Sequence, residues 1–549
     1  MASRRDELNA YSFARKRTTA AFLKPLPNGS IESAPRPLRS VLPSIVLGAV
    51  VLVGFGACGI LKPVAPKGWD TPAQNVIVGD ESTTRYVVLN SKDENGKNQK
   101  LLHPILNLAS AKLLLDPKKF KVVKVKESEL DGKIPHGPAI GIPYAPDRLP
   151  SAKEAEAPKV WAVCVRPGSG ENSKAQQAVF VLGGKDKKRV EGNGRLDLHQ
   201  ALYVQDPKGV KYLVDQNGVA FTFDATMGGK IPLSGGNKEA ANALLRRIIF
   251  GDAQPQQVSA EWMNTLIKSP VPIGLPAVPD AGKPSTAKGV PAGHNTIGSI
   301  LQTSDSQQKY VVLKDGLEKV SNFIAKLLLE GPNAQAVQKS DRKMEAISVS
   351  ASSITPKTDE KEQPVQFMGA DPRTGAALPW PSEVVSMANA AAAPGGAGTG
   401  LGSQNRADVT CSVYKGTSTE YANGAGKALG FNKAVPDMAT WVGKDYPAPI
   451  APGATSYVTP GSGLLYQQVT ANADSGSLFL VTDTGLRYSV PRNNDSADKA
   501  GNAEKEQDQS KLHLGYENVR PPTVDKAWSQ LLSEGPVLDV SSAKKPQSS

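Results

Sequence analysis

The residues that could do acid, base or metal chemistry are few and widely separated. The chain of 549 residues has five histidines, which are His103, His136, His199, His294 and His513. No two of them have the spacing of a metal-binding pair. It contains neither the His-Glu-x-x-His motif of zinc hydrolases nor the Gly-x-Ser-x-Gly turn of a serine nucleophile. We therefore predict no metal ion and no catalytic residue. A triad assembled from distant positions would leave no local pattern, and that alternative stays open.

The nearest match to a phosphate-binding loop is YANGAGKALG at residues 421–430. A Walker A loop has a glycine five residues before its Gly-Lys pair, and this chain has Tyr421 there. The loop also has Ser or Thr after the lysine to hold magnesium, whereas Ala428 follows Lys427. We therefore interpret this segment as an ordinary loop and predict no nucleotide or other cofactor.

The three cysteines fall in two different settings. Cys58 ends an apolar run, whereas Cys164 in KVWAVCVRPG and Cys411 in ADVTCSVYKG each lie in a short β-like segment. Two cysteines outside a reducing compartment usually pair, so we predict a Cys164–Cys411 disulfide. The alternative is two buried free thiols.

A stretch of twenty-one residues without a charge, from Val41 to Leu61, determines where the chain is located. As a helix it would rise about 31 Å, which matches the hydrocarbon thickness of a bilayer. The 39 residues before it are too many for a cleaved signal peptide, and Phe55 disfavours a lipoprotein signal ending at Cys58. A buried core helix would show a polar stripe. We predict an uncleaved single-pass transmembrane helix.

Charge predicts the orientation of this helix. Residues 1–39 hold eight Lys or Arg and three acidic residues, whereas the first fifteen residues after Leu61 hold only two Lys or Arg, Lys62 and Lys67. By the positive-inside rule the N-terminus is cytoplasmic and the bulk of the chain is extracytoplasmic, at the plasma membrane. The net charge of +12 is spread along the chain without aromatic-interleaved basic patches, so we predict no nucleic-acid partner.

Two kinds of unit occur twice in the exported part. One pairs YVVL with AKLLL, at 86–89 and 111–115 and again at 310–313 and 325–329, and predicts a strand, a turn and an apolar helix. The other pairs YLVDQNGVAF (212–221) or FLVTDTGLRY (479–488) with a later Pro-x2-Val-x3-Trp-x7-Pro motif. The motif residues are Pro255, Val258, Trp262 and Pro270 in one copy, and Pro521, Val524, Trp528 and Pro536 in the other. We predict that Trp262 and Trp528 anchor their repeats.

These patterns predict an α+β protein with a single transmembrane helix, followed by an elongated extracytoplasmic body of four small α/β repeats around a central β domain. Each half of the body contributes one cysteine segment to the central domain. The predicted parts are a cytoplasmic basic tail (1–39), the transmembrane helix (40–62), repeat 1 (76–150), the first part of the central β domain (155–198), repeat 2 (200–280), repeat 3 (295–355), the second part of the central β domain (363–445), repeat 4 (460–540) and a disordered tail (541–549).

The cytoplasmic tail contains RRDELNAYSFARKRTTAAFL, in which apolar residues alternate with a basic cluster. Two interpretations stay open for a helix of this kind. It could rest on anionic lipid headgroups, or it could dock on a partner protein.

The tail pattern RRDELNAYSFARKR, the single apolar segment, LLHPILNLASAKLLL with GPAIGIPYAP, and the ending LGYENVRPPTV…GPVLD together resemble the EccB family. EccB is the single-pass membrane component of the actinobacterial type VII (ESX) secretion machine. The resemblance implies assembly with an EccC-type ATPase, with EccD and EccE and with a mycosin protease nearby, and a homo-oligomeric arrangement within the complex. It also implies the pairing of the two cysteines. Some members are described as ATPases, so an extracytoplasmic ATPase stays an alternative, as does a cell-wall-binding module.

Overall fold

The computed structural model describes most of the chain. The described residues are 3–23, 38–60, 65–92, 97–168, 175–227, 237–288, 290–338, 343–370, 378–389, 408–418, 429, 435–470, 476–491 and 509–547.

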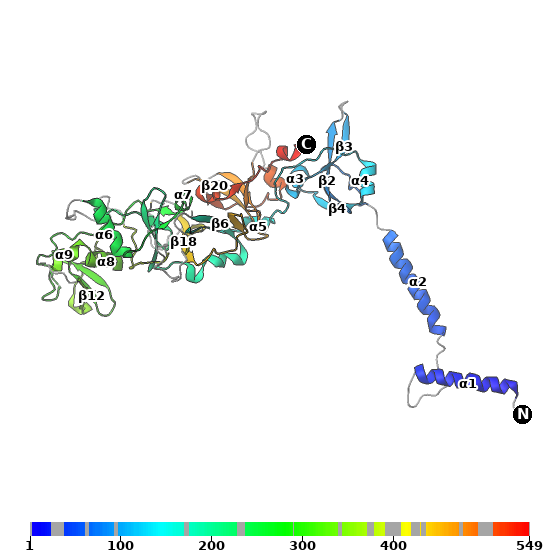
Figure 1. The fold of residues 1–549 in the computed structure, drawn as a ribbon, viewed down its shortest axis with the longest axis horizontal. Coiled ribbons are helices and arrows are strands. Elements are labelled where there is room, and N and C mark those ends of the chain that lie inside the picture. The colour runs from blue at the N-terminus through cyan, green and yellow to red at the C-terminus, as the bar shows by residue number, and fades with distance from the viewer. Residues whose placement is uncertain are drawn as a thin grey trace.

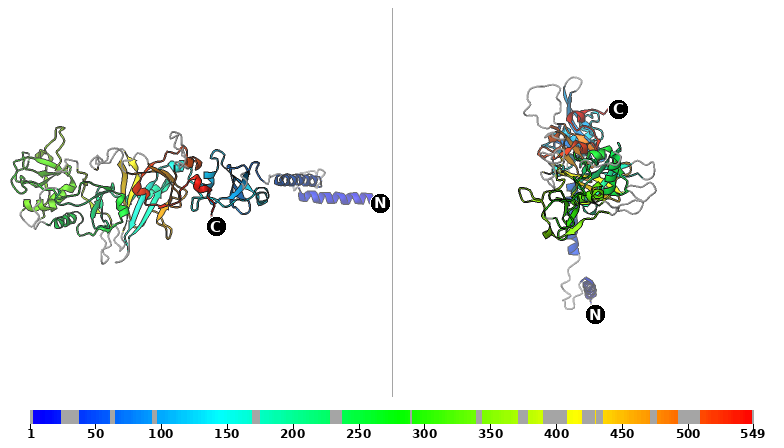
Figure 2. Two further views of the ribbon diagram at one scale, coloured as in Figure 1. Left: turned by 90° about the horizontal axis from the view of Figure 1, so that it is seen from above. Right: turned by 90° about the vertical axis from the view of Figure 1, so that its left-hand side faces the viewer.

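These residues form a mixed α/β body built from five small sheets arranged along one line (Figure 1). Helices α1 (Arg4–Leu23) and α2 (Leu38–Ile60) lie at one end of the molecule. Moving away from them, the order in space is repeat 1, repeat 4, the central sheet, repeat 2 and repeat 3 (Figures 1 and 2). The two halves of the chain are therefore interleaved in space, and the body is elongated.

Repeats 1 and 3 share one topology. Three antiparallel strands are followed by a helical crossover to a fourth strand, which runs parallel to the first. In repeat 1 the elements are β1 (Asn75–Gly79), β2 (Arg85–Lys92), β3 (Asn98–Pro104), α3 (Leu108–Leu114), β4 (Lys121–Val125) and α4 (Glu127–Lys133). In repeat 3 they are β12 (Ile300–Thr303), β13 (Lys309–Val312), β14 (Leu317–Val320), α8 (Asn322–Glu330), α9 (Pro332–Gln338) and β15 (Ile347–Val349).

The prediction of a strand, a turn and an apolar helix for this unit was incomplete. The YVVL segments lie in β2 and β13 and the AKLLL segments in α3 and α8, but a further strand, β3 or β14, lies between them. It pairs back on the YVVL strand and buries Leu102 or Leu317. Each of these strands has few apolar residues, so the alternation that marks a strand is weak there.

Repeats 2 and 4 share a second topology, with three antiparallel strands flanked on each edge by a short parallel strand. Repeat 2 has β7 (Gln200–Gln205), β8 (Lys211–Val214), β9 (Val219–Phe221), α6 (Lys238–Phe250), β10 (Gln256–Gln257), α7 (Ala260–Asn264) and β11 (Ile267–Lys268). Repeat 4 has β20 (Leu464–Val469), β21 (Ser477–Val481), β22 (Leu486–Ser489), α10 (Gln509–His513), β23 (Thr523–Asp525), α11 (Lys526–Ser529) and β24 (Ser533–Glu534). Gly218, in the turn between β8 and β9, and Gly485, in the turn between β21 and β22, have φ of 69° and 80°, a region that favours glycine.

The central sheet has the strand order β18-β17-β5-β6-β19. Its strands are β5 (Val160–Arg166), β6 (Gln176–Leu182), β17 (Val409–Ser418), β18 (Val435–Gly443) and β19 (Ser456–Val458). Helix α5 (Ala152–Glu156) precedes β5, and the 3-10 turns η2 (Gly184–Val190) and η3 (Gly192–Gly194) follow β6. The second cysteine segment is thus inserted beside the first, as the sequence predicted for a domain built from both halves.

The boundary at 363–445 needs correction. Residues near its start belong to the repeats, because Gln366 bridges to Lys319 of repeat 3 and β16 (Ser386–Met387) pairs with β7 of repeat 2. At its other end the central sheet continues past residue 445 to β19. Backbone hydrogen bonding, which the local sequence does not display, sets both limits.

The disordered tail predicted at 541–549 was also wrong for the residues described. Asp539 caps the N-terminus of helix α12 (Val540–Lys544), and its side chain accepts from the Ser542 amide at 2.7 Å. Ala543 is fully buried, and α12 packs on α3 of repeat 1. Beyond it, Gln547 hydrogen-bonds the Ala139 carbonyl. A polar, charged tail is ordered here because it covers another repeat.

Two hydrophobic cores hold the line of sheets together. One is shared by repeats 1 and 4 and contains Val76, Val87, Leu465 and Leu480. The larger one joins the central sheet to repeats 2, 3 and 4. Repeats from opposite halves of the chain therefore pack on each other, and none of the four is isolated.

Helix α2 covers most of the predicted transmembrane segment, with Pro43 in its first turns. Among the residues that the structure describes, no helix meets the combined length and apolarity needed to cross a membrane. Leu61, the predicted end of the segment, lies outside the described residues. The transmembrane helix Val41–Leu61 stays a prediction.

Candidate functional site

The central sheet presents two different faces to the rest of the molecule. Successive side chains of a strand point to opposite faces, so β5 places Trp161 and Val163 on one face and Ala162 and Cys164 on the other. The first face belongs to the core shared with the repeats. The second forms a separate core with Phe180 and other apolar residues of the same sheet.

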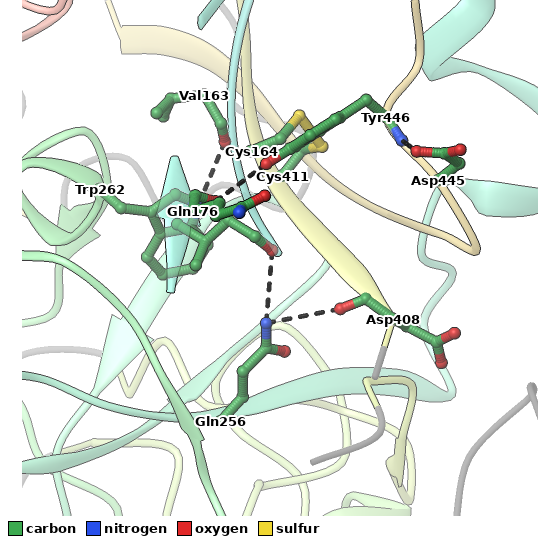
Figure 3. The surroundings of a disulfide bond; sticks show 10 residues. Val163, Cys164, Gln176, Gln256, Trp262, Asp408, Cys411, Asp445 and Tyr446 are labelled. Atoms are coloured by element: carbon green, nitrogen blue, oxygen red, sulfur yellow. Dashed lines mark hydrogen bonds between the residues drawn. A yellow bond between two sulfur atoms is a disulfide. The ribbon is translucent and has the colours of Figure 1, made fainter. Parts of the chain in front are cut away.

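The predicted disulfide is present on the second face. Cys164 and Cys411 are directly opposite each other in the antiparallel pairing of β5 with β17, and they form a disulfide (Figure 3). Both residues are fully buried. The bond joins positions 247 residues apart and so ties the first half of the chain to the second.

Trp262 anchors repeat 2 on the first face. Ser259 caps α7 by accepting from the Trp262 amide at 3.0 Å, and this fixes the start of the helical turn. The indole is fully buried, and its Nε1 donates to the carbonyl of Val163 at 3.1 Å (Figure 3). The tryptophan therefore contacts the residue next to Cys164 along β5.

Trp528 anchors repeat 4 on the same face, but on strand β17. Asp525 caps α11 and accepts from the Ala527 amide at 2.8 Å. The indole stacks on the ring of Tyr414, with centroids 5.6 Å apart, and the Tyr414 hydroxyl donates to the Thr523 carbonyl at 3.2 Å. The duplicated motif thus performs the same task twice, on neighbouring strands of one sheet.

A buried polar network that the sequence did not reveal reinforces repeat 2. The side chain of Asn389 accepts from the Tyr203 amide at 2.9 Å and donates to its carbonyl at 3.0 Å, as a strand would. Asn389 also donates to Gln256, whose amide donates to the Val165 carbonyl of the central sheet. The same Gln256 amide donates to the Asp408 carbonyl (Figure 3). Asn389 is followed by a run rich in alanine and glycine, and no local pattern distinguishes this asparagine from an exposed one.

Asp215 is a second residue that the sequence did not single out. It starts the turn between β8 and β9, where one carboxylate oxygen accepts from the amides of Asn217 and Val219 at 2.9 and 2.8 Å. Its carbonyl accepts from the Thr440 hydroxyl of β18. Asp215 lines a cavity of about 340 Å³ together with Trp380. Burial raises the pKa of its carboxyl to about 7, against the two amide hydrogen bonds that lower it.

Charged groups attach the start of repeat 4 to the central sheet. Lys159 is buried and donates to Glu154 at 2.8 Å, and Glu154 also accepts from Ser462. Burial lowers the pKa of Lys159, whereas its hydrogen bond lowers the pKa of Glu154. Asp186 accepts from Arg189 and from Tyr457 of β19, and the Arg189 guanidinium lowers the pKa of Asp186.

The described residues do not bring metal-ligand side chains together. No group of three or more His, Cys, Asp or Glu within this part of the chain could hold a metal ion. The glycine-rich segment with Lys427 lies outside the described residues except for Leu429. The predictions of no catalytic residue, no metal and no cofactor therefore stay predictions. The contacts described above attach repeats 2 and 4 to the central sheet.

Removing the disulfide should destabilise the body without changing its fold. Closing a loop of this length contributes about 5 kcal/mol in the chain-entropy model, so Cys164→Ser should lower the free energy of unfolding by several kcal/mol. Thermal melting measures this loss, and non-reducing peptide mapping should recover the two cysteine peptides as one species. Cys58→Ser is the control. Free alkylation of both thiols in protein from the intact envelope would refute the bridge.

The two anchors should respond differently to graded substitution. Trp262→Ala and Trp528→Ala should each cost about 3–5 kcal/mol, because each removes a buried indole. Trp262→Phe should cost about 1 kcal/mol more than Trp528→Phe because, of these two indoles, only that of Trp262 donates a hydrogen bond within the described residues. Chemical unfolding curves of the four variants test this order. Equal losses in the two phenylalanine variants would contradict the role of the Val163 contact.

Asp215 should make stability depend on pH. Its folded pKa is raised, so the folded state holds the proton more tightly, and stability should fall as pH rises from about 4 to about 7. Asp215→Asn keeps the acceptor and removes the charge, so its melting temperature should exceed that of the parent increasingly from pH 5 to pH 8. Asp206→Asn alters the same kind of turn at a more exposed position and serves as the control. A pH-independent difference for Asp215→Asn would refute the shift.

Comparison with known proteins gives one consistent family. The family model for EccB, described as type VII secretion system ESX-1, transport TM domain B, matches residues 1–547. The ESX-3 secretion system ATPase EccB3 of Mycobacterium tuberculosis is 25% identical over 519 residues, which cover 91% of this chain and 82% of the relative. The ESX-2 secretion system ATPase EccB2 of the same species is 26% identical, over 89% of this chain and 86% of the relative.

A solved structure has the same fold. The EccB3 dimer from the ESX-3 core complex matches with a TM-score of 0.50 and 22% identity, covering 86% of this chain and 99% of that one. Because one family model spans the chain almost from end to end, this protein belongs to the EccB family of the type VII secretion system.

Proposed function

We propose that this chain is the single-pass membrane scaffold subunit of a type VII (ESX) secretion complex, with its repeats forming the outer part of the secretion channel. The observation that carries the proposal is the interleaving of the two halves. Strand β17 of the second half lies between β18 and β5, and the duplicated tryptophan motifs attach repeats 2 and 4 to that sheet. Such an arrangement is suited to spanning distance rather than to enclosing a reaction.

The proposed topology places the N-terminus in the cytoplasm and the bulk of the chain outside. The excess of basic residues before Val41 supports this orientation. So does the disulfide, because a buried disulfide persists in an oxidising compartment. Cleavage before Val41, detected by mass spectrometry of the membrane-bound protein, would overturn the single-pass anchor.

The partners proposed are an EccC-type ATPase, EccD and EccE, with a mycosin protease nearby and several copies of this chain. On the proposed cytoplasmic side, the residues that the structure describes before α2 offer α1 as a contact surface. Its apolar side chains are exposed, with Leu8 at 72%, Tyr11 at 73% and Phe22 at 89%. These three residues lie on one side of the helix, since they are spaced by three and eleven positions. A partly apolar surface of this kind fits a docking role.

ATP hydrolysis is the second candidate function, because the related EccB2 and EccB3 proteins carry the word ATPase in their names. In this chain the nearest match to a phosphate loop, at residues 421–430, lacks two of the required residues. We therefore rank the scaffold first and use Lys427 to separate the two functions.

Deleting residues 2–23 should abolish assembly with the cytoplasmic ATPase partner while leaving the exported body folded. The physical reason is that α1 lies apart from the sheets of the body (Figure 1) and supplies the exposed apolar surface described above. Co-purification of the tagged protein measures assembly, and an unchanged melting temperature verifies folding. Lys427→Ala, which would disable a true phosphate loop, should leave secretion intact.

The scaffold proposal predicts a larger loss of secretion for the deletion of 2–23 than for Lys427→Ala, and the ATPase alternative predicts the reverse. Loss of secretion in Lys427→Ala with a normally assembled complex, together with a harmless deletion of 2–23, would defeat the scaffold proposal.

A further inference from the structure

Repeat 1 carries a lysine-rich edge strand that its duplicate lacks. The segment DPKKFKVVKVK at 116–126 holds five lysines and one acidic residue, and β4 within it is an edge strand of its sheet. All five lysines are exposed: Lys118, Lys119, Lys121, Lys124 and Lys126. Side chains of a strand point alternately to the two faces of the sheet, so the lysines of this edge strand lie on both faces.

The ion pairs of the described residues neutralise only part of this charge. Lys119 lies 3.8 Å from Asp116, and Lys124 lies 3.7 Å from Asp80, both at exposed positions where such pairs are weak. The remaining three lysines of the strip have no ion pair within the described part of the chain. The nearby carboxylate of Glu127 accepts the backbone amides of residues 81 and 82 instead.

Repeat 3 provides an internal comparison. Tyr86 pairs with Ile77 in repeat 1, and Tyr310 pairs with Leu301 in repeat 3, so these two positions correspond. In the parallel pairs that follow, Ile77 lies opposite Val123, and Leu301 lies opposite Ile347. The two registers therefore show which residue of β4 corresponds to which residue of β15.

The correspondence shows that the charge is not a requirement of the fold. Where repeat 1 has Lys121, Lys124 and Lys126, repeat 3 has Glu345, Ser348 and Ser350. The pattern of exposure along the two strands is nearly the same, so both surfaces face solvent. These three lysines are thus specific to one copy of the duplicated unit, whereas the same register carried back along the chain places Lys118 and Lys119 at the basic residues Arg342 and Lys343.

The copy with the lysines is the one beside α2. Trp69 lies nine residues after Ile60, so the chain between them spans at most about 32 Å. Trp69 is buried in the small core that also contains Val125 of β4. The chain therefore enters repeat 1 next to the lysine-rich strand, whereas repeat 3 lies at the far end of the body (Figure 1).

We propose that the strip 116–126 of repeat 1 docks on anionic phospholipid headgroups of the membrane surface from which α2 emerges. Each lysine close to an anionic membrane surface is attracted to it electrostatically, and salt screens this attraction. The contact would fix the tilt of the elongated body relative to the membrane. The proposal rests on the single-pass topology proposed above.

The test uses the full chain in nanodiscs of phosphatidylcholine alone or with phosphatidylglycerol, followed by hydrogen exchange of the peptide covering 116–126. We expect deuterium uptake to be about twofold lower in the anionic discs, and equal in the two lipids at about 0.5 M salt. The triple variant Lys121→Gln, Lys124→Gln, Lys126→Gln should lose the difference. The control Lys314→Gln, Lys343→Gln, Lys361→Gln, at exposed positions of repeat 3 and the segment after it, should keep it.

The outcomes separate this proposal from the topology on which it rests. A chain that does not enter discs of either lipid overturns both. Equal uptake in the two lipids by a chain that has entered the discs overturns the lipid contact alone. Protection of 116–126 that occurs only in the whole secretion complex would assign the strip to a protein partner and also overturn it.

Discussion

The position of β17 between β5 and β18 is the constraint on which the rest of the structure depends. A strand inside a sheet must satisfy its backbone groups on both edges, and β17 does so with one neighbour from each half of the chain. The second half of the chain therefore cannot separate from the first without breaking the ladder between β17 and β5. The disulfide at Cys164 and Cys411 locks this ladder covalently.

The order of the repeats follows from that sheet. Repeat 4 continues from β19 at one edge of the sheet and packs against repeat 1, whereas repeat 2 packs against repeat 3. The motifs that contain Trp262 and Trp528 hold repeats 2 and 4 to adjacent strands of the sheet. Duplicated units thus occupy different places in the line, and their surfaces are free to differ, as β4 and β15 do.

Much of this architecture could be predicted because it depends on motifs that recur with the same spacing along the sequence. Duplicated segments identified the repeats, and two isolated cysteines in β-like runs identified the disulfide. The tryptophan motif is identical in spacing in its two copies, and its local cap, Ser259 or Asp525, fixes the same helical turn in both. Features that depend on local residue order and on repetition can be recognised from the amino-acid sequence alone.

The features that could not be predicted depend on contacts between distant segments. The side chain of Asn389 bonds to the backbone amide and carbonyl of Tyr203, as a neighbouring strand would do with its backbone. Nothing in the sequence around Asn389 indicates that partner. The tail after residue 540 has the composition of a disordered segment, yet Ala543 is buried because α3 of another repeat is near. Asp215 looks like any turn aspartate, and its raised pKa arises from burial at the contact with β18.

The central claim is that both halves of the chain build one sheet. A protease site placed within residues 390–407 would allow the chain to be cut between repeat 3 and β17. Size-exclusion chromatography of the cut protein, with the disulfide reduced and without denaturant, is the most direct measurement. We predict that both fragments elute together as a body of unchanged size, because β17 keeps its ladder to β5. Separation of the fragments on reduction would contradict a shared sheet, because the two fragments would then be joined only by the disulfide.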